Sequence, residues 1–435
     1  MVALTERAAV RRLHDRFGFG PRAGDLDRGF DETLSRLLGG GDDAGAKATP
    51  PPQVGAPPAR PKKQDKADKT AKQQANKQLQ TQATDVGLWW LDRMVAADVA
   101  SVERLTWFWH GHFATSEQKV RSPELMLTQN QTQRGLALGS FTQLAQAMIV
   151  DPALLLWLDG GKNKAGSPNE NLAREFMELF ALGVGHYNEN DVREAARALT
   201  GWTAGRDTTT AKLVPKRHDD KTKQILGSTG DFDAKSFVDL VLGRPDSARF
   251  VVGRVWFRLV SAAPPPTDVL NRLVAAYGGA RDVRALLKAI AAEPAFRDSA
   301  TSLVKQPVEW LAGLLRALKV RPADFDDKTK GQLLAGLRGM GQVPFQPPSV
   351  GGWAAGGAWL TTSAGVARLH LAQLVTEHAD LGGLEAARDR PAVLADALGV
   401  DGWSDRTRAA LAGVAGDVRQ LSTVAACAPE YVVSG

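Results

Sequence analysis

VGLWWLDRMVAADVASVERLTWFWHGHF, residues 86–113, is the stretch that decides the fold. Its large apolar side chains recur three and four positions apart, which is the spacing of one face of an α-helix. They fall into two stripes, the first of Trp89, Trp90, Met94 and Val95 and the second of Val102, Leu105 and Trp109. Alternating patterns typical of strands are scarce along the rest of the chain. The sequence therefore predicts an all-α protein, a single large irregular helical domain with long ordered loops.

Composition places the chain among ordinary globular proteins. Of its 435 residues, 43% are hydrophobic and 23% charged, so a large core can form without disulfides or a metal. Cys427 is the only cysteine, which excludes an intramolecular disulfide and a cysteine-built zinc site. No run of about 18 apolar residues predicts a membrane span, and no apolar leader opens the chain. We therefore expect a cytoplasmic protein without a membrane span.

Three segments differ in composition and predict the domain organisation. Residues 1–38 carry apolar side chains at helical spacing and predict an N-terminal helical segment that packs on the main domain. Residues 39–83 are rich in Pro, Ala, Lys and Gln and predict a disordered insert, with good helix formers near its end. Residues 84–435 form the predicted main helical domain.

The net charge of +6 is concentrated in the insert. Between Arg60 and Lys77, seven basic residues accompany two acidic ones, so this segment supplies +5 of the total. The rest of the chain is nearly neutral, which argues against a phosphate-binding surface across the fold. We therefore expect no nucleic-acid partner and favour a solvated linker over a DNA-binding arm.

Further helices are predicted by spacing over residues 136–150 and 237–260, among others. Residues 344–359 instead combine prolines, glycines and two tryptophans, and predict a long ordered loop. In that loop, Trp353 and Trp359 either pin the backbone to the core or stack on a planar or sugar ligand. We favour the first alternative.

The stretch most favourable for acid/base chemistry is a helix predicted from Ser167 to Leu182, because it carries several carboxylates and one arginine. It opens with Ser167-Pro168-Asn169-Glu170, which has the pattern of a capping box with proline at the first helical position. This pattern predicts a structural role for Glu170 before any catalytic one.

Glu175 is the side chain of this helix best placed for proton transfer. At about 100° per residue, the buried stripe consists of Leu172, Phe176, Leu179 and Phe180. Glu175 lies at the edge of that stripe, where partial burial raises the pKa of a carboxyl group. We choose Glu175 with Glu178 as its partner, and Arg174 to bind an anionic group. The alternative is a buried Glu–Arg network that ties helices together.

Histidines add two weaker signals. His110 and His112 flank Gly111, but side chains two apart point to different sides of a helix, so they bind a metal only if Gly111 breaks the helix. A structural His112 is the favoured alternative. His218-Asp219 lies in an irregular polar segment, where it could serve as an acid/base pair or as ligands, or be a chance pair of neighbours.

Several blocks of sequence, spread over nearly the whole chain, form a recognisable set. The N-terminal ones are Arg16-Phe17-Gly18-Phe19-Gly20-Pro21 and Trp109…His112-Phe113. The central ones are Pro168-Asn169-Glu170-Asn171-Leu172-Ala173-Arg174-Glu175, Glu178-Leu179-Phe180…Leu182-Gly183, Asp191-Val192…Ala196-Arg197-Ala198-Leu199-Thr200-Gly201-Trp202 and His218-Asp219. The last are Lys305…Pro307-Val308-Glu309 and Gly341-Gln342 followed by Pro347-Pro348…Gly352-Trp353. Together these blocks resemble the bacterial domain-of-unknown-function family numbered 1800. The resemblance implies a large helical protein, often encoded beside a sulfatase-like family that is a candidate protein partner, and it implies no reaction.

Two hypotheses of function follow. In the first, the protein is an enzyme that uses the carboxylate-rich helix for acid/base or metal-assisted transfer or hydrolysis on a sugar- or anion-containing substrate. Its candidate catalytic residues are Glu175, Glu178, Arg174, His112, His218 and Asp219, and its candidate substrate-binding residues are Asn169, Asn171, Arg197, Trp353 and Trp359. No nucleotide-binding glycine loop, HExxH or GxSxG motif occurs, so no cofactor is named and no metal site is predicted. In the second, the protein is a non-catalytic helical scaffold or binding protein that acts with a protein partner.

Overall fold

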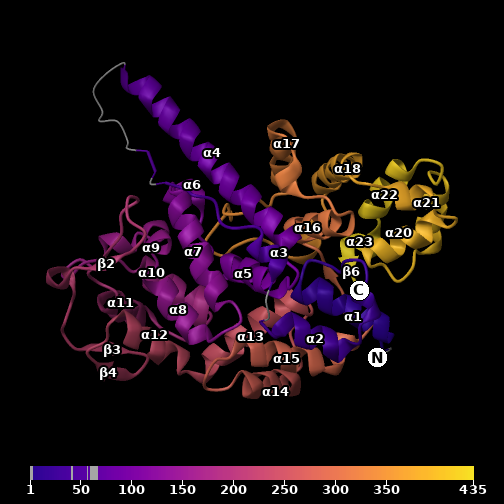
Figure 1. Cartoon of the computed structure of the whole chain (residues 1–435). Helices are drawn as coiled ribbons and strands as arrows, with labels where there is room; N and C mark the ends of the chain where they lie inside the picture. The colour runs from indigo at the N-terminus through magenta and orange to yellow at the C-terminus, as the bar shows by residue number, and fades with distance from the viewer. Residues whose placement is uncertain (1–2, 41–42, 56, 59–66) are drawn as a thin grey trace.

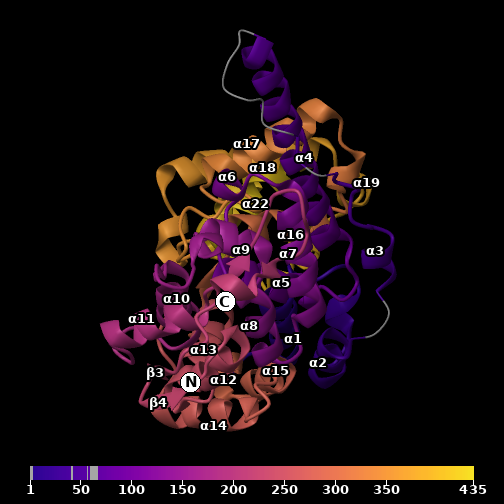
Figure 2. The same ribbon diagram turned by 90° about the vertical axis from the view of Figure 1, so that its left-hand side faces the viewer.

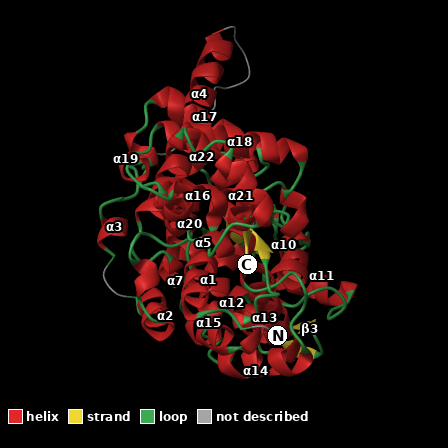
Figure 3. Ribbon diagram, turned by 90° about the vertical axis from the view of Figure 1, so that its right-hand side faces the viewer, coloured by secondary structure: helices red, strands yellow, loops and turns green. Residues whose placement is uncertain are grey.

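The computed structural model describes residues 3–40, 43–55, 57–58 and 67–435, and helices make up almost all of its regular structure (Figures 1 and 3). The first part of the chain forms α1 (Glu6–Phe17), α2 (Phe30–Leu38), α3 (Ala44–Lys47), α4 (Ala67–Ala96), α5 (Ser101–His112), α6 (Glu117–Val120), α7 (Pro123–Leu136), α8 (Phe141–Ile149) and α9 (Pro152–Trp157). The middle part forms α10 (Asn171–Glu175), the π-helix η3 (Phe176–Ala181), α11 (Glu189–Ala198), α12 (Ala234–Leu242), α13 (Pro245–Leu259), α14 (Thr267–Tyr277) and α15 (Val283–Ala292). The last part forms α16 (Pro307–Ala317), α17 (Asp327–Gly339), α18 (Thr362–Glu377), α19 (Gly382–Glu385), α20 (Arg390–Leu398), α21 (Asp405–Ala412), α22 (Val418–Cys427) and α23 (Pro429–Val432). These elements confirm the predicted all-α class.

The strands of the described residues are short and form three antiparallel pairs. They are β1 (Trp202–Thr203) with β2 (Lys212–Leu213), β3 (Lys223–Ile225) with β4 (Ser228–Gly230), and β5 (Leu303–Val304) with β6 (Val433–Ser434). Single turns of 3-10 helix lie between the longer elements, at η1 (Asp25–Asp27), η2 (Gly160–Lys162), η4 (Pro215–Arg217), η5 (Pro294–Arg297), η6 (Pro322–Asp324) and η7 (Gly356–Trp359). In the described part of the chain, no helix combines the length and the apolar character needed to cross a bilayer.

Helix α5 lies at the centre of the molecule, between the C-terminal helices α16–α18 and α22 and the helices α12–α15 (Figure 2). It contributes to two hydrophobic clusters. Trp109 and Phe108 belong to the cluster that contains α8 and α12–α15, whereas Trp107 belongs to the cluster that contains α4, α16 and α18. Apart from Val102 and Gly111, every residue of α5 is buried, its charged side chains and histidines included, so the helix is enclosed on nearly all sides.

A buried carboxylate fixes α5 against its neighbours. Glu103 is 1% exposed and accepts hydrogen bonds from the Trp90 indole at 3.1 Å and from Arg93 Nε at 2.7 Å, both on α4. Arg134 on α7 donates to the same carboxylate from Nε at 2.7 Å and from Nη2 at 2.8 Å. Burial alone would raise the pKa of Glu103, but Arg134 and Arg93 outweigh that effect and lower the pKa. Side chains of α4, α5 and α7 therefore meet at one buried carboxylate, whose negative charge is neutralised by Arg93 and Arg134.

Arginines of α1 hold the C-terminal residues. Arg11 Nη2 and Arg12 Nε donate to the Gly435 carbonyl at 3.1 and 3.2 Å, and Arg16 Nη2 donates to the Ser434 carbonyl at 2.8 Å. The two chain ends therefore lie close together in the fold (Figure 1).

Two predicted helix boundaries differ from the structure because of local breakers. The helix predicted over 237–260 is two helices, α12 and α13. Helix α12 ends at Leu242, just before Gly243, and Pro245 starts the next helix without a backbone N–H to continue the previous one. The helix predicted over 136–150 begins only at Phe141, because α7 ends at Leu136 and a turn separates it from α8.

The segment predicted as a disordered insert contains ordered structure in its described part. The Thr49 carbonyl accepts hydrogen bonds from the Trp89 indole at 3.1 Å and from Arg93 Nη1 at 2.9 Å. The described part of the predicted insert thus contains the short helix α3, and the helix expected near the end of the insert is the start of α4. That helix runs unbroken across the predicted boundary at residue 83, and its first half projects from the body (Figure 1). The rest of the predicted insert lies partly outside the described residues, at 41–42, 56 and 59–66.

We expect Glu103→Gln to lower the free energy of unfolding by about 3 kcal/mol, because it leaves two buried guanidinium groups without their counter-charge. Chemical denaturation measures this loss. The control is Glu377→Gln, which changes an exposed glutamate on α18 and should shift stability by less than about 0.5 kcal/mol. Equal stability of the two variants would show that the Glu103 network does not hold α5 in place.

Candidate functional site

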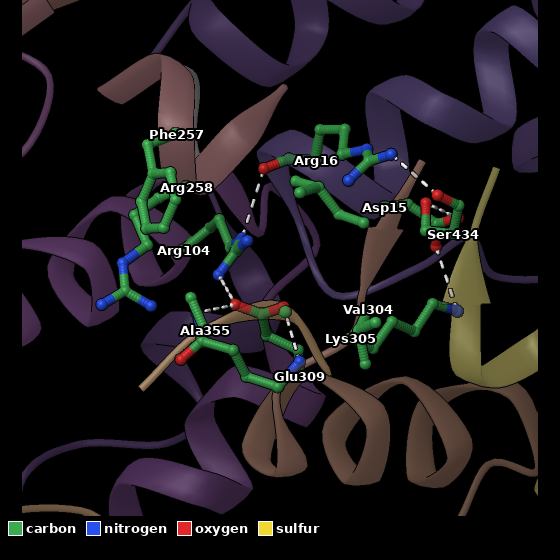
Figure 4. Close-up of a pocket in the computed structure, with 13 residues that line it drawn as sticks. Asp15, Arg16, Arg104, Phe257, Arg258, Val304, Lys305, Glu309, Ala355 and Ser434 are labelled. Atoms are coloured by element: carbon green, nitrogen blue, oxygen red, sulfur yellow. Dashed lines mark hydrogen bonds and ion pairs between the residues drawn. The ribbon is translucent and has the colours of Figure 1, made fainter. Parts of the chain in front are cut away.

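Two small adjoining cavities lie between α5, α13 and the segment from β5 to α16. Figure 4 shows the first of them. The first has a volume of about 30 Å³ and the second about 20 Å³. Arg104, Arg258 and Gln306 line both, so the cavities share a wall. The cationic side chains that border them are Arg16, Arg104, Arg254, Arg258 and Lys305. We call this pair of cavities the arginine cleft.

Two carboxylates neutralise part of the positive charge of the arginine cleft. Glu309 forms an ion pair with Arg104 (Figure 4). Asp15 lies 3.4 Å from Lys305 Nζ and accepts a hydrogen bond from Ser434 Oγ at 3.1 Å. Burial would raise the pKa of Asp15, but the charge of Lys305 outweighs burial and the pKa is lowered. Five cations and two carboxylates line the cleft, which leaves three positive charges in excess.

Helix α13 supplies two of the arginines. Arg254 and Arg258 are four positions apart and therefore lie on one face of the helix. Arg258 donates to the carbonyls of Trp353 and Ala354 at 2.7 and 2.9 Å. Arg254 makes no hydrogen bond or ion pair with any described residue, and its Nε is buried. Burial lowers the pKa of Arg254, and burial together with the charge of Arg254 lowers the pKa of Arg258 to about 10.

The glycine-rich loop reaches the cleft because glycines let its backbone lie against α5. Gly352 has a φ of +79°, and a Cβ atom there would lie 2.3 Å from the Gly111 carbonyl oxygen. The next residue, Trp353, stacks on Trp107 with ring centroids 4.8 Å apart and lines the second cavity. Trp359 is also buried, at 5% exposure. Both tryptophans therefore pack into the hydrophobic core, and contact of Trp353 with a ligand stays a prediction.

His112 is the predicted catalytic residue that lines the cleft. Its Nε2 lies 2.7 Å from the Phe180 carbonyl oxygen, which only accepts, so that nitrogen carries the proton. Burial lowers the pKa of His112 to about 3, with a further contribution from Arg254, and the ring is neutral at pH 7. Helix α5 continues through Gly111, so His110 and His112 point to different sides and do not form the metal pair considered from the sequence.

The carboxylate-rich helix begins later than predicted. Its first element, α10, starts at Asn171, and Ser167 lies outside it in an isolated β-bridge. The Asn163 side chain accepts the backbone N–H of Asn169 at 2.9 Å and shapes the turn before the helix. The predicted capping box of Ser167 and Glu170 is therefore wrong, because a side chain from the preceding loop organises this turn instead.

Glu175 and Glu178 lie close together but outside the arginine cleft. Glu178 accepts a hydrogen bond from the Tyr187 hydroxyl at 2.6 Å. Glu175 is half-buried and, among the described residues, has no hydrogen bond or ion pair. Burial and the charge of Glu178 raise the pKa of Glu175. Arg174, which was expected to bind an anionic group, is paired with Glu189 at 2.7 Å.

The other predicted site residues support the turns around α11. Asp219 accepts two hydrogen bonds from Arg197, at 2.8 and 3.1 Å, and this pairing lowers the pKa of Asp219 to about 2. His218 Nδ1 lies 2.9 Å from the Thr200 carbonyl oxygen and does not pair with its neighbour. The Asn171 side chain donates to a carbonyl at 3.2 Å. None of these predicted residues lines the arginine cleft. Within the described ranges, no group of three or more His, Cys, Asp or Glu side chains is placed to hold a metal ion.

Comparison with known protein families gives a match over nearly the whole chain. The model of a family described as a protein of unknown function, DUF1800, matches residues 12–433. The chain belongs to this family. The match confirms the family that the sequence blocks indicated, and no curated protein and no solved structure matches the chain.

The cations of the cleft are the residues that sequence reasoning missed. Arg104, Arg254 and Arg258 each lie in a helix that apolar spacing predicts. A charged residue among these apolar side chains was the signal in the sequence that could have identified them as site residues. Arg16 and Lys305 belong to the sequence blocks that resemble the DUF1800 family, but nothing in those blocks indicated that they meet.

Glu175→Gln should stabilise the protein above pH 5 and have little effect at pH 4. The raised pKa of Glu175 means that the folded protein disfavours its charged form, so a penalty appears as the pH rises above the ordinary glutamate pKa of about 4.3. Thermal unfolding at pH 4 and pH 8 measures the difference. Glu189→Gln, which removes a favourable pairing with Arg174, should act in the opposite direction at pH 8. A lower melting temperature of Glu175→Gln at pH 8 would mean that a cation neutralises this carboxylate.

Proposed function

We propose that this protein binds a small anion, or the anionic end of a larger ligand, in the arginine cleft. One water needs about 10–15 Å³ on this measure, so cavities of about 30 and 20 Å³ together hold a few waters or a group of that size and do not enclose a whole sugar. The excess of three positive charges selects for negative charge. This proposal keeps the anion-containing ligand expected from the sequence and moves its site from the carboxylate-rich helix to the cleft.

The observation that carries the proposal is the unpaired guanidinium of Arg254. Arg254 is partly buried, its Nε has no partner, and no described carboxylate neutralises its charge, so an anion at this guanidinium would gain an interaction that the protein leaves free. Arg104 and Arg258 border the same small cavity and have partners, Glu309 for one and two backbone carbonyls for the other. An anion in this cavity would give Arg254 the partner that the protein does not supply.

The enzyme hypothesis has less support than the binding hypothesis. Its proton-transfer pair, Glu175 and Glu178, does not line the cleft, and His112, which does, is neutral at pH 7 with its Nε2 proton donated to a backbone carbonyl. We therefore assign the cleft to binding. A transfer or hydrolysis reaction stays a hypothesis, because the unpartnered Nδ1 of His112 is a weak base when burial lowers the pKa of the ring to about 3, and Asp15 and Glu309 are held in ion pairs.

We expect Arg254→Gln to weaken anion binding at least about tenfold, the loss expected for one charge-assisted hydrogen bond. The measurement is the rise in melting temperature on titration with sodium salts of small anions at constant ionic strength, since a ligand of the folded state stabilises it by mass action. The matched control is Arg249→Gln on the same helix, whose guanidinium is exposed and bound to Asn271.

Two outcomes contradict the proposed function. One is a wild-type protein whose melting temperature does not respond to any of the anions. The other is a response that Arg254→Gln and Arg249→Gln leave equally intact, because the site would then not depend on the cleft.

A different surface supports the alternative, a non-catalytic protein that acts with a protein partner. Helices α17 and α18 enclose an apolar groove with a volume of about 710 Å³. Small residues such as Gly336 and Ala367 line it, and Val366 is 50% exposed at its edge. Exposed apolar grooves of this kind commonly receive a helix or a loop of another protein. The sulfatase-like family that accompanies DUF1800 proteins is the candidate partner.

Val366→Glu should abolish co-purification of a sulfatase-like protein from the same genome, because it places a charge in the apolar groove. Val393→Glu is the matched control, since Val393 is similarly exposed, at 45%, and lies outside the groove on α20. Equal recovery of the partner with both variants would remove the groove as its binding site.

A further inference from the structure

The charges of the arginine cleft do not balance within the protein. Glu309 pairs with Arg104 and Asp15 pairs with Lys305, so these four charges cancel in two pairs (Figure 4). The cations that remain without a carboxylate at the cleft are Arg16, Arg254 and Arg258.

Backbone carbonyls do not neutralise the remaining cations. Arg16 Nη2 donates to the Ser434 carbonyl at 2.8 Å, and Arg258 Nη2 donates to the Trp353 carbonyl at 2.7 Å. Such contacts satisfy N–H donors, but a carbonyl carries only a partial charge, so each guanidinium keeps most of its positive charge. Burial strengthens the effect of these charges because water screens them less. About three units of positive charge therefore act on the contents of the cleft.

We infer that the cleft takes a doubly charged tetrahedral oxyanion, the chemistry shared by sulfate and phosphate, and that Glu309 sets this charge preference. The inference rests on the proposed function of the cleft. A dianion neutralises two of the three excess charges, whereas a monoanion such as chloride or acetate leaves two of them uncompensated. The oxygens of a tetrahedral anion can also accept hydrogen bonds from several guanidinium groups at once. This suits the two adjoining cavities taken together, since Arg104 and Arg258 border both and Arg254 borders the second.

Glu309 is placed by the fold and not by a ligand. It is the third residue of α16, where its Oε2 accepts the backbone N–H of Gln306 at 3.1 Å and its Oε1 accepts the Gln306 side-chain amide at 2.6 Å. These cap bonds hold the carboxylate beside Arg104 whether the cleft is empty or filled. Glutamine at this position keeps an oxygen for the cap and removes the charge, so it adds one positive charge to the cleft.

The experiment is isothermal titration of the full-length protein with sodium sulfate, sodium phosphate and sodium acetate at pH 8 and constant ionic strength. In the wild type, at least one of the two tetrahedral dianions should bind at least about tenfold more tightly than acetate. Glu309→Gln should raise the affinity for that dianion by about fivefold or more. The matched control is Glu293→Gln, which changes a similarly buried glutamate, 8% exposed against 11% for Glu309, whose partner Arg272 is half-exposed and lies outside the cleft; it should leave affinity within about twofold.

The two tetrahedral anions distinguish the source of the ligand. Tighter binding of sulfate indicates a sulfate or sulfate ester, tighter binding of phosphate indicates a phosphate or phosphate ester, and either result supports the inference. Acetate that binds as tightly as both dianions overturns the inference and leaves the proposed anion site intact. The absence of binding by all three anions overturns the proposed function itself.

Glu309→Gln tests the role of that residue separately. Circular dichroism and the melting temperature establish that the variant is folded before titration. A folded Glu309→Gln protein whose affinity for the dianion is unchanged or lower shows that Glu309 does not set the charge preference. The comparison of dianion with monoanion in the wild type does not depend on any variant.

Discussion

The buried carboxylate of Glu103 is the constraint on which the rest of the structure depends. A full charge in the interior is tolerated only if partners surround it, and here Arg93, Arg134 and the Trp90 indole do so from two other helices. Apolar packing alone would let α5 slide or rotate between its two hydrophobic clusters, because such contacts are not directional. The hydrogen bonds to Glu103 remove that freedom, and they fix both the register and the rotation of α5.

The position of the arginine cleft follows from that of α5. The residue after Glu103 is Arg104, which lines both cavities, and the same helix carries Gly111, against which the loop at Gly352 lies. The second cavity is bordered by Trp107 from one hydrophobic cluster and by Phe108 from the other. The cleft thus lies at the junction of the two clusters, where long cationic side chains occupy the space that apolar packing does not close. A site at such a junction is positioned by both halves of the molecule.

Apolar spacing and breaker residues predicted the all-α class, the ordered loop near Trp353 and most helices, because those signals are local. The start of α10 could not be predicted, since Asn163, which shapes the turn before it, acts from outside the helical pattern. The arginine cleft could not be predicted from the sequence either. Its cations come from α1, α5, α13 and the segment before α16, and periodicity does not indicate which helices face each other. The carboxylates of the α10 region could be predicted as a group because they are neighbours in sequence. Arg254 and Lys305 are far apart in sequence, and only the fold brings both to the arginine cleft.

The carboxylate-rich helix and the arginine cleft each contain a partly buried charged group without a partner among the described residues. These groups are the carboxylate of Glu175 and the guanidinium of Arg254, and they differ in chemistry. Glu175 can relieve its burial by taking up a proton, and its raised pKa shows that tendency. An unpaired glutamate therefore does not require a ligand. Arg254 has no such route at neutral pH, because a guanidinium keeps its proton even where burial lowers its pKa. Its Nε is buried, and no described residue neutralises its charge, so the partly exposed guanidinium depends on water or on an anion. The arginine cleft, and not the carboxylate-rich helix, is therefore where we propose that a ligand binds.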